Sequence, residues 1–300
     1  MKVSCTHEQN LAGIPSASAI ELAGENLIIF GDDARSLYVL NRARVLAQVV
    51  PLPGISPGQS RRIPKHEKPD IESAFSYVSA GETHVLALGS GSSGTMRDSG
   101  LHVHIDPLGA ICIEELALGD LYNYLRQAPE IGPPAVLNIE GAAMTDEHVI
   151  LAQRAAGCSG NYLMRFELAA FISWLENNTL LPAAEFIPVH LGSVSGVEAG
   201  LTGLAFSPVH RRLFFTAAVE DRNDPVQDGA VLGSFIGSFS WHAQQQLALD
   251  SCEVPENLPA TRKLESICLL HENDGLVQAV AVADDDMGSS HLADICISLP

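Results

Sequence analysis

The sequence predicts an all-β fold, a five-bladed β-propeller that spans residues 1–300 as a single domain. Short runs rich in Val, Ile, Leu and Phe follow one another along the chain, and Gly, Asp, Asn or Ser bounds them. A two-strand unit recurs five times, and the two chain ends complete its last copy. A propeller of six blades is the less favoured alternative, because little sequence remains to build a sixth.

The recurring unit is a short strand, a tight turn, and a strongly apolar strand that ends in polar residues. Its copies pair SAIEL with NLIIFGDD, DIESAF with HVLALGSGSS, NIEGAAM with HVILAQR, GLTGLAF with RLFFTAAVED, and KLESICLL with LVQAVAVADDD. Aligning the copies places five polar residues in one column: Ser18, Glu72, Glu140, Thr202 and Glu265. Neighbours in this column lie 54 to 68 residues apart. Blades of about 40–50 residues with added loops have this spacing.

The chain ends predict how the ring closes. The last copy supplies three strands, LESICLL, VQAVAVA and ADICISL, and VSCTHE near the N-terminus supplies a fourth. Pairing the two ends in one blade removes the exposed edges of an open sheet. Two segments break the strand pattern: residues 119–127 have helical spacing, and residues 166–178 fit either a helix or an outer strand.

Charge and cysteine usage limit the partners and the compartment. The formal net charge of −19 repels nucleic acid and anionic membranes, so we expect neither as a partner. No apolar run reaches the length of a membrane span, and the first ten residues lack the apolar core of a signal peptide. The six cysteines form no CxxC pair and most lie in apolar runs, which indicates buried thiols in a reducing compartment. We therefore expect a cytoplasmic protein.

The aligned column predicts a metal site at the propeller axis. The innermost strands of a propeller line its central channel, so Ser18, Glu72, Glu140, Thr202 and Glu265 should form a ring. Three facing carboxylates repel one another unless a proton or a cation compensates them. Carboxylate and hydroxyl oxygens suit calcium, whereas zinc would favour His or Cys. The alternative is a polar, water-filled channel in which protonation, or Lys65, Lys263 and Arg154, neutralises the ring.

The order Ser–Glu–Glu–Thr–Glu over five blades resembles the calcium-activated nucleotidases (apyrases). The segments KLESI and GLTGLAFSP resemble motifs of that family, while NIEGAA and KLESI also resemble the phytase-esterase-like propellers. The resemblance implies a five-bladed propeller with an axial calcium ion held by the column residues. Two departures weaken the implied nucleotide hydrolysis: the aromatic-rich second-blade signature is absent, and Thr202 stands where the family has Ser.

Loops at the same face predict a pocket for a small anionic molecule above the ring. In the segment 89–100, Ser90 and Ser92 belong to a Gly/Ser run whose backbone N–H groups can face an anion, and Arg97 can clamp it. Arg154 should project from the same face as a second clamp. The alternative for the loop is a flexible connection between two strands. The alternative for Arg154 is a salt bridge to Glu72, Glu140 or Glu220.

Three acidic residues at the strand ends are candidates for catalysis. Asp32, Glu220 and Asp285 follow the second strands of their blades, where a carboxylate can act as a general base or orient a metal ligand. Turn formation is the competing explanation for the aspartates.

His102 and His104 lie two apart on one predicted strand and therefore on one face. Two histidines can bind a metal, but no third ligand is near them in sequence. We therefore favour a solvated or packed strand face over a metal site.

Two functions remain open at this stage. The first is a calcium-dependent hydrolase of phosphate esters or anhydrides. The second is a non-catalytic propeller scaffold that binds a ligand or a protein and uses the metal to tie its blades together. A fold of this kind hosts unrelated functions, so fold alone does not choose between them.

Overall fold

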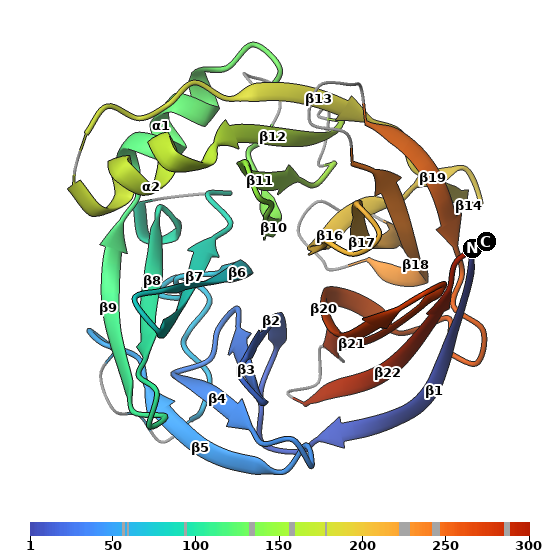
Figure 1. Ribbon diagram of the computed structural model, residues 1–300, viewed down its shortest axis with the longest axis horizontal. Coiled ribbons are helices and arrows are strands. Elements are labelled where there is room, and N and C mark those ends of the chain that lie inside the picture. The colour runs from blue at the N-terminus through green and yellow to red at the C-terminus, as the bar shows by residue number, and fades with distance from the viewer. Residues whose placement is uncertain are drawn as a thin grey trace.

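The computed structural model describes residues 1–55, 58, 60–92, 95–131, 136–155, 160–177, 179–221, 229–241, 247–284 and 289–300. Five four-stranded antiparallel sheets are arranged as blades around a central axis, which confirms the predicted five-bladed propeller (Figure 1). None of the helices in the described ranges is long and apolar enough to cross a membrane.

Within each blade the strands run outward from the axis in chain order, apart from the last blade. Blade 1 contains β2 (Ala17–Ala23), β3 (Asn26–Gly31), β4 (Ser36–Leu40) and β5 (Leu46–Pro51). Blade 2 contains β6 (Ile71–Ser79), β7 (Glu82–Gly89), β8 (Ser99–Ile105) and β9 (Ile111–Ala117). Blade 3 contains β10 (Ile139–Met144), β11 (His148–Gln153), β12 (Asn161–Glu167) and β13 (Glu185–Val189). Blade 4 contains β16 (Gly200–Ser207), β17 (Arg212–Asp221), β18 (Ala230–Ser240) and β19 (Ala248–Glu253), and a small hairpin of β14 (Ser193–Val194) and β15 (Val197–Glu198) precedes it.

Blade 5 is built from both ends of the chain, as predicted. It contains β20 (Lys263–Asn273), β21 (Leu276–Asp284), β22 (Ser290–Ser298) and β1 (Lys2–Leu11). Strand β1 pairs antiparallel with β22 as the outermost strand. The Ser290 hydroxyl then joins blade 5 to the start of blade 1, since it donates to Ile14 O at 3.0 Å and accepts from Ala17 N at 2.8 Å. The ring is thus closed by sheet pairing and by a buried hydrogen-bonding side chain.

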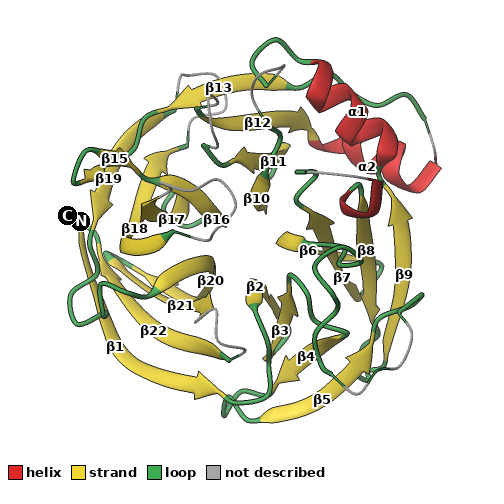
Figure 2. Ribbon diagram, turned by 180° about the vertical axis from the view of Figure 1, so that it is seen from behind, coloured by secondary structure: helices red, strands yellow, loops and turns green. Residues whose placement is uncertain are grey.

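Two helices lie outside the ring between blades 2 and 3 (Figure 2). Helix α1 (Gly119–Gln127) has the predicted bounds. Of the two structures that the sequence allowed for residues 166–178, a helix or an outer strand, most of the segment forms the helix α2 (Leu168–Asn177). A short 3₁₀ turn, η1 (Thr95–Arg97), precedes β8. Leu121 and Leu125 of α1 and Phe171 of α2 belong to the hydrophobic cluster that fills the gap between the two blades.

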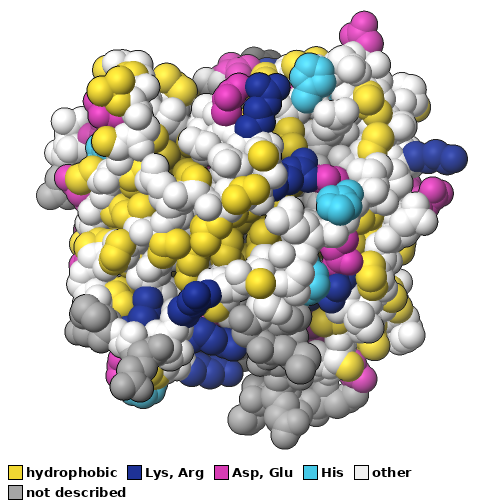
Figure 3. Space-filling view, turned by 90° about the horizontal axis from the view of Figure 1, so that it is seen from below, with side chains coloured by type: hydrophobic (Ala, Val, Ile, Leu, Met, Phe, Trp, Pro, Cys, Tyr) yellow, Lys and Arg dark blue, Asp and Glu magenta, His cyan; other side chains and the backbone are white. Residues whose placement is uncertain are grey.

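The hydrophobic core lies between neighbouring blades. Ile28 and Phe30 of blade 1, for example, belong to one cluster with Val85 and Val103 of blade 2. The outermost strands contribute exposed surface: on the rim seen in Figure 3, hydrophobic side chains gather on the outside, and Leu46 and Val49 of β5 are among the exposed ones. The second strand of each blade is the most apolar, because neighbouring blades cover both of its faces.

Each residue of the predicted column lies at a β-bulge, and the bulge is at the same place in every blade. Each innermost strand shifts its pairing register with the second strand at a β-bulge. The unpaired residues at these bulges are Ser18, Glu72, Glu140, Thr202 and Glu265. A bulge bends the strand and re-aims the side chain of the extra residue. The sequence repeat is therefore a structural repeat at the axis.

Candidate functional site

A pocket of about 310 Å³ opens at the axis, at the end where the innermost strands begin. Polar and charged side chains dominate its wall. The lining residues are Ser16, Ala17, Ser18, Asp32, Asp33, Arg62, Lys65, Lys68, Asp70, Glu72, Ser92, Arg97, Asn138, Glu140, Arg154, Glu220, Lys263, Glu265 and Asp284. Eight of these described residues are acidic and six are basic. With all of them ionised, the wall carries a formal charge of −2.

One half of the wall is a chain of buried ion pairs. Arg154 Nη1 lies 2.7 Å from Glu140 Oε2, and its Nη2 lies 3.1 Å from Glu220 Oε2. Lys263 Nζ continues the chain, 2.9 Å from Glu220 Oε1 and 3.0 Å from Glu265 Oε1. The side chain of Arg154 is only 4% exposed. Such a pair is costly to desolvate but costlier still to break, since removing one partner leaves a buried charge uncompensated.

The pKa values in this half follow from burial and from the neighbouring charges. Burial lowers the pKa of Arg154, but Glu140, Glu220 and Glu265 raise it well above its ordinary value. Burial raises the pKa of Glu265 to about 7, although Lys263 opposes the shift. Basic side chains therefore compensate the ring carboxylates Glu140 and Glu265, which is the neutralisation that the sequence left open as an alternative to calcium.

The other half of the wall centres on Asp70 at the start of blade 2. Lys68 Nζ lies 2.6 Å from Asp70 Oδ1 and also contacts Asp32 Oδ2. Arg97 Nη1 lies 2.8 Å from Asp70 Oδ2, and the Ser90 hydroxyl donates to the same oxygen. Asp70 is thus surrounded by donors, two of which, Ser90 and Arg97, come from the predicted ligand-binding loop.

Asp32 and Glu72 in this half have carboxylate oxygens without a hydrogen-bond partner among the described residues. Single carboxylate oxygens of Asp32, Asp70 and Glu72 all lie within 4.8 Å of one another. Asp32 Oδ1 is buried without a hydrogen-bond partner, and Glu72 has no hydrogen bond or salt bridge to any residue in the described ranges. Burial, followed by the charges of Asp70 and Asp32, raises the pKa of Glu72 well above its ordinary value. Asp32 Oδ1 and the Glu72 carboxylate are thus left without a direct cationic partner among the described residues, although Lys68 and Arg97 pair with the neighbouring oxygens.

The two hydroxyls of the column face a neighbouring blade. The Ser18 hydroxyl donates to Ile71 O at 2.5 Å, and the Thr202 hydroxyl donates to Leu264 O at 2.6 Å. Each acceptor is the residue directly before the column glutamate of the next blade. Ser18 and Thr202 therefore tie the innermost strands together at equivalent positions, and Thr202 is not among the residues that line the pocket.

A family model matches residues 13–297 of the chain, and its description reads "Family of unknown function (DUF6929)". The chain belongs to this family. No curated protein matches it in sequence.

Solved structures with the same fold cover nearly the whole chain of this DUF6929 member. The glutaminyl cyclase of Myxococcus xanthus is 10% identical with a TM-score of 0.52, and the match covers 99% of this chain and 97% of the other. An α-L-arabinanase of Cellvibrio cellulosa is 10% identical with a TM-score of 0.50, covering 94% and 91%. An exo-1,5-α-L-arabinanase from a bovine ruminal metagenomic library is 11% identical with a TM-score of 0.50, covering 95% and 94%. At these identities the likeness shows the propeller fold alone, so the resemblance to nucleotidases and phytase-esterase-like propellers stays a sequence resemblance.

The structure brings most of the predicted site residues of this family member to one face. Asp32, Ser92, Arg97, Arg154 and Glu220 line the pocket. Ser90 is buried behind them, donates its hydroxyl hydrogen to Asp70, and has its oxygen 2.9 Å from the Ser92 hydroxyl oxygen. Asp285 lies outside the described residues. The roles predicted for these residues stay predictions.

Sequence reasoning assigned no role to Lys68 or to Asp70, the first residue of the second copy of the repeat. The repeat could have predicted Asp70, because residues two apart on a strand share a face and the residues two before the column should therefore also face the axis. The residues two before each column position are Ser16, Asp70, Asn138, Gly200 and Lys263, and all but Gly200 line the pocket. Ser16 and Asp70 also share a left-handed backbone conformation, with φ of 48° and 57°. Such strained residues gather at functional sites.

Proposed function

We propose that the axial pocket binds a divalent cation, with calcium preferred, through Asp32, Asp70 and Glu72, and holds a small polar ligand over it. The observation that carries the proposal is the buried, unpartnered Asp32 Oδ1 beside the unpaired Glu72 carboxylate. An unpartnered buried oxygen is costly, and a bound cation would remove that cost. One divalent ion also matches the formal charge of −2 on the wall.

The donor atoms suit a hard cation. All three ligands offer carboxylate oxygens, which are the ligands that calcium prefers, and calcium tolerates irregular geometry better than magnesium does. No His or Cys is among the residues that line the described part of the pocket, so a softer metal has less to bind here. The ligand set differs from the predicted ring, and of the five column residues it keeps Glu72.

Lys68 couples the cation to an anionic ligand. Its ammonium group contacts both Asp32 and Asp70, so a cation that bound these carboxylates would displace it. Lys68 and Arg97 would then face the pocket with fewer carboxylate partners. This arrangement supports a small anionic molecule as the ligand, which binds after the cation.

Hydrolysis of a phosphate ester or anhydride is the second candidate function. The exposed Lys65 at the pocket and Arg97 on its wall favour it, because positive groups stabilise the charge that develops during phosphoryl transfer. A divalent cation supplies polarisation of the phosphoryl oxygen and activation of water.

The test is calcium titration of the chelator-treated chain by calorimetry, combined with thermal melts. We expect one calcium ion per chain and a rise in stability of about 2.7 kcal/mol at a free calcium concentration of about 100 times Kd. Glu72→Gln should abolish both effects while keeping the shape of the side chain. Glu21→Gln is the matched control, since Glu21 is another carboxylate on an innermost strand but lines a different pocket.

Absence of calcium binding in the unmodified chain, or equal binding in Glu72→Gln, would contradict the proposal. A positive result justifies a screen of phosphate esters. Turnover that Arg97→Ala abolishes would support the hydrolase, whereas calcium binding without turnover would favour a binding scaffold.

A further inference from the structure

Three histidines meet on blade 2, away from the axial pocket. His84 lies on β7, and His102 and His104 lie on β8. His84 pairs directly with His104 across the two strands, and His102 is opposite Leu86, two residues further along β7. The three side chains therefore share one face of the sheet, and His84 is the third ligand that sequence spacing alone could not supply.

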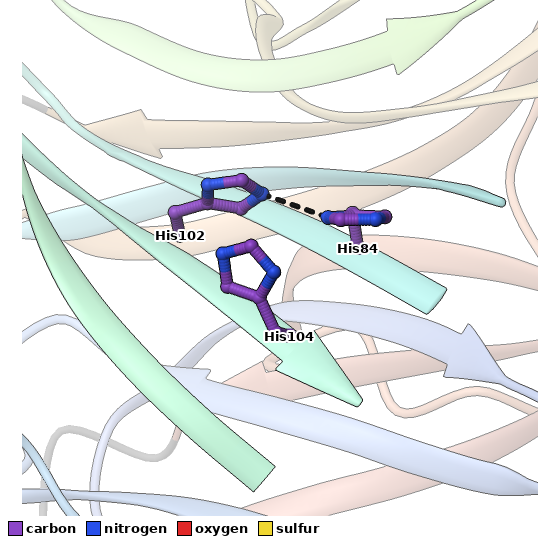
Figure 4. Close-up of side chains that lie close together, drawn as sticks. All are labelled: His84, His102 and His104. Carbon is purple, nitrogen blue, oxygen red and sulfur yellow. Dashed lines mark hydrogen bonds between the residues drawn. The ribbon is translucent and has the colours of Figure 1, made fainter. Parts of the chain in front are cut away.

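The rings are close enough for their nitrogens to share a metal ion. His84 Nδ1 lies 3.1 Å from His102 Nε2, and one nitrogen from each of the three rings lies within 4.8 Å of the others. The ring centroids of His102 and His104 are 4.0 Å apart. Figure 4 shows the three rings gathered together, with His102 and His104 extending from β8 and His84 from the neighbouring β7. Zinc bonded to nitrogens at about 2.1 Å in a tetrahedron needs nitrogens ~3.4 Å apart, so small ring rotations suffice.

The surroundings bury one ring and orient another. His102 is only 9% exposed, and the His104 ring lies against it. The Tyr77 ring stacks on His84 with centroids 4.8 Å apart and 10° between the planes. An oriented ring loses less freedom when it binds a metal.

The site has room for a fourth ligand. On β9, the exposed free thiol of Cys112 lies opposite His104, and the exposed Glu114 lies opposite His102. Glu114 Oε2 is 3.9 Å from His104 Nε2. Since facing residues on neighbouring strands point to the same side of a sheet, both side chains emerge on the face of the histidines. Water, thiolate or carboxylate can therefore complete a four-coordinate ion.

We propose that His84, His102 and His104 form a metal site for zinc or a similar transition-metal ion. Three imidazole nitrogens suit zinc, copper and nickel, whereas the axial carboxylates suit calcium. Gly89, at the axial-pocket end of β7, is five residues from His84, or ~17 Å along an extended strand. The site is thus separate from the axial pocket and does not rest on the function proposed for it.

The test is a zinc titration of the untagged, chelator-treated full chain by competition calorimetry. We expect one zinc ion per chain, and His104→Gln should weaken binding at least ~100-fold, because even losing a residue that supports a ligand costs ~10–100-fold. His148→Gln is the matched control: His148 is a partly buried strand histidine outside the cluster, and zinc affinity should not change. Glu72→Gln should also leave zinc binding intact, which separates this site from the axial pocket.

A second measurement needs no variant. Copper(II) bound at one equivalent should show coupling to imidazole nitrogens by electron paramagnetic resonance. The proposal fails if the unmodified chain binds no zinc stoichiometrically, if the copper spectrum shows only oxygen ligands, or if folded His104→Gln and His84→Gln both bind zinc as tightly as the unmodified chain.

Discussion

The guanidinium of Arg154 lies 2.7 Å from the carboxylate of Glu140, and both side chains are buried at the centre of the propeller. Arg154 follows the second strand of blade 3, and Glu140 is the bulged residue of the first. The same guanidinium reaches Glu220 of blade 4 at 3.1 Å. One arginine thus joins two blades through charges that are shielded from water.

Arg154→Met should destabilise the protein by ~3–5 kcal/mol, since it leaves Glu140 buried without its cation. Urea unfolding measures the change. Arg42→Met is the control, because the pair of Arg42 with Glu25 is exposed and should contribute at most ~1 kcal/mol. Equal costs in the two variants would show that the buried pair is not structural. Adding Glu140→Gln to Arg154→Met should recover part of the loss.

Gly200→Ala should also destabilise the protein, by ~1–3 kcal/mol, because the added methyl group would overlap the Arg154 side chain. A Cβ atom at Gly200 would lie 2.6 Å from Arg154 Cγ and 2.8 Å from its Nε. Gly119→Ala is the control, since nothing lies within 4 Å of its added Cβ. Thermal melts of the two variants should differ clearly, and matching melting temperatures would refute the close approach.

Lys68→Gln should strengthen calcium binding ~10-fold or more, because it removes an ammonium group from Asp32 and Asp70 without removing either ligand. Calorimetric titration measures the affinity. Lys65→Gln is the control: Lys65 also lines the pocket but is exposed, so its loss should change calcium affinity less. A weaker affinity in Lys68→Gln would mean that Lys68 is part of the binding site and not a competitor of the cation.

Glu21→Gln should flatten the dependence of stability on pH. Burial raises the pKa of Glu21 from an ordinary 4.5 to about 8, although its hydrogen bond from Ser76 opposes the shift. The folded state therefore holds a proton that the unfolded state releases at lower pH. The contribution of Glu21 to stability is fully present below pH 4.5 and is lost as the pH rises through about 8. Glu21→Gln should match the unmodified protein at the acidic end and exceed it in stability above pH 8.

Thermal melts across this pH range test the Glu21 prediction. Glu25→Gln, a change at an exposed carboxylate on the turn after β2, should reproduce the pH profile of the unmodified chain. If Glu21→Gln also keeps that profile, then Glu21 does not titrate in the way its burial implies.

Local pattern was enough to predict the blades. The alternation of short apolar strands, the five-fold repeat and the complementary chain ends predicted the propeller and its closure, and the helix at 119–127 was visible from its periodicity. The five-residue column that begins with Ser18 and ends with Glu265 could also be predicted, because each blade repeats the same bulge at the same place.

The sequence did not predict which side chains contact one another within the site. Whether Glu140 faces a calcium ion or Arg154, and whether His102 has a third histidine beside it, depends on side chains from segments that meet only in the folded ring. A repeat determines which residues reach the axis, since that position follows from strand order and pleat. The charge that each one meets there depends on the packing of neighbouring blades and strands, so the tertiary structure alone decided that Glu72 is unpaired, Asp70 is enclosed by donors, and His84 joins His102 and His104.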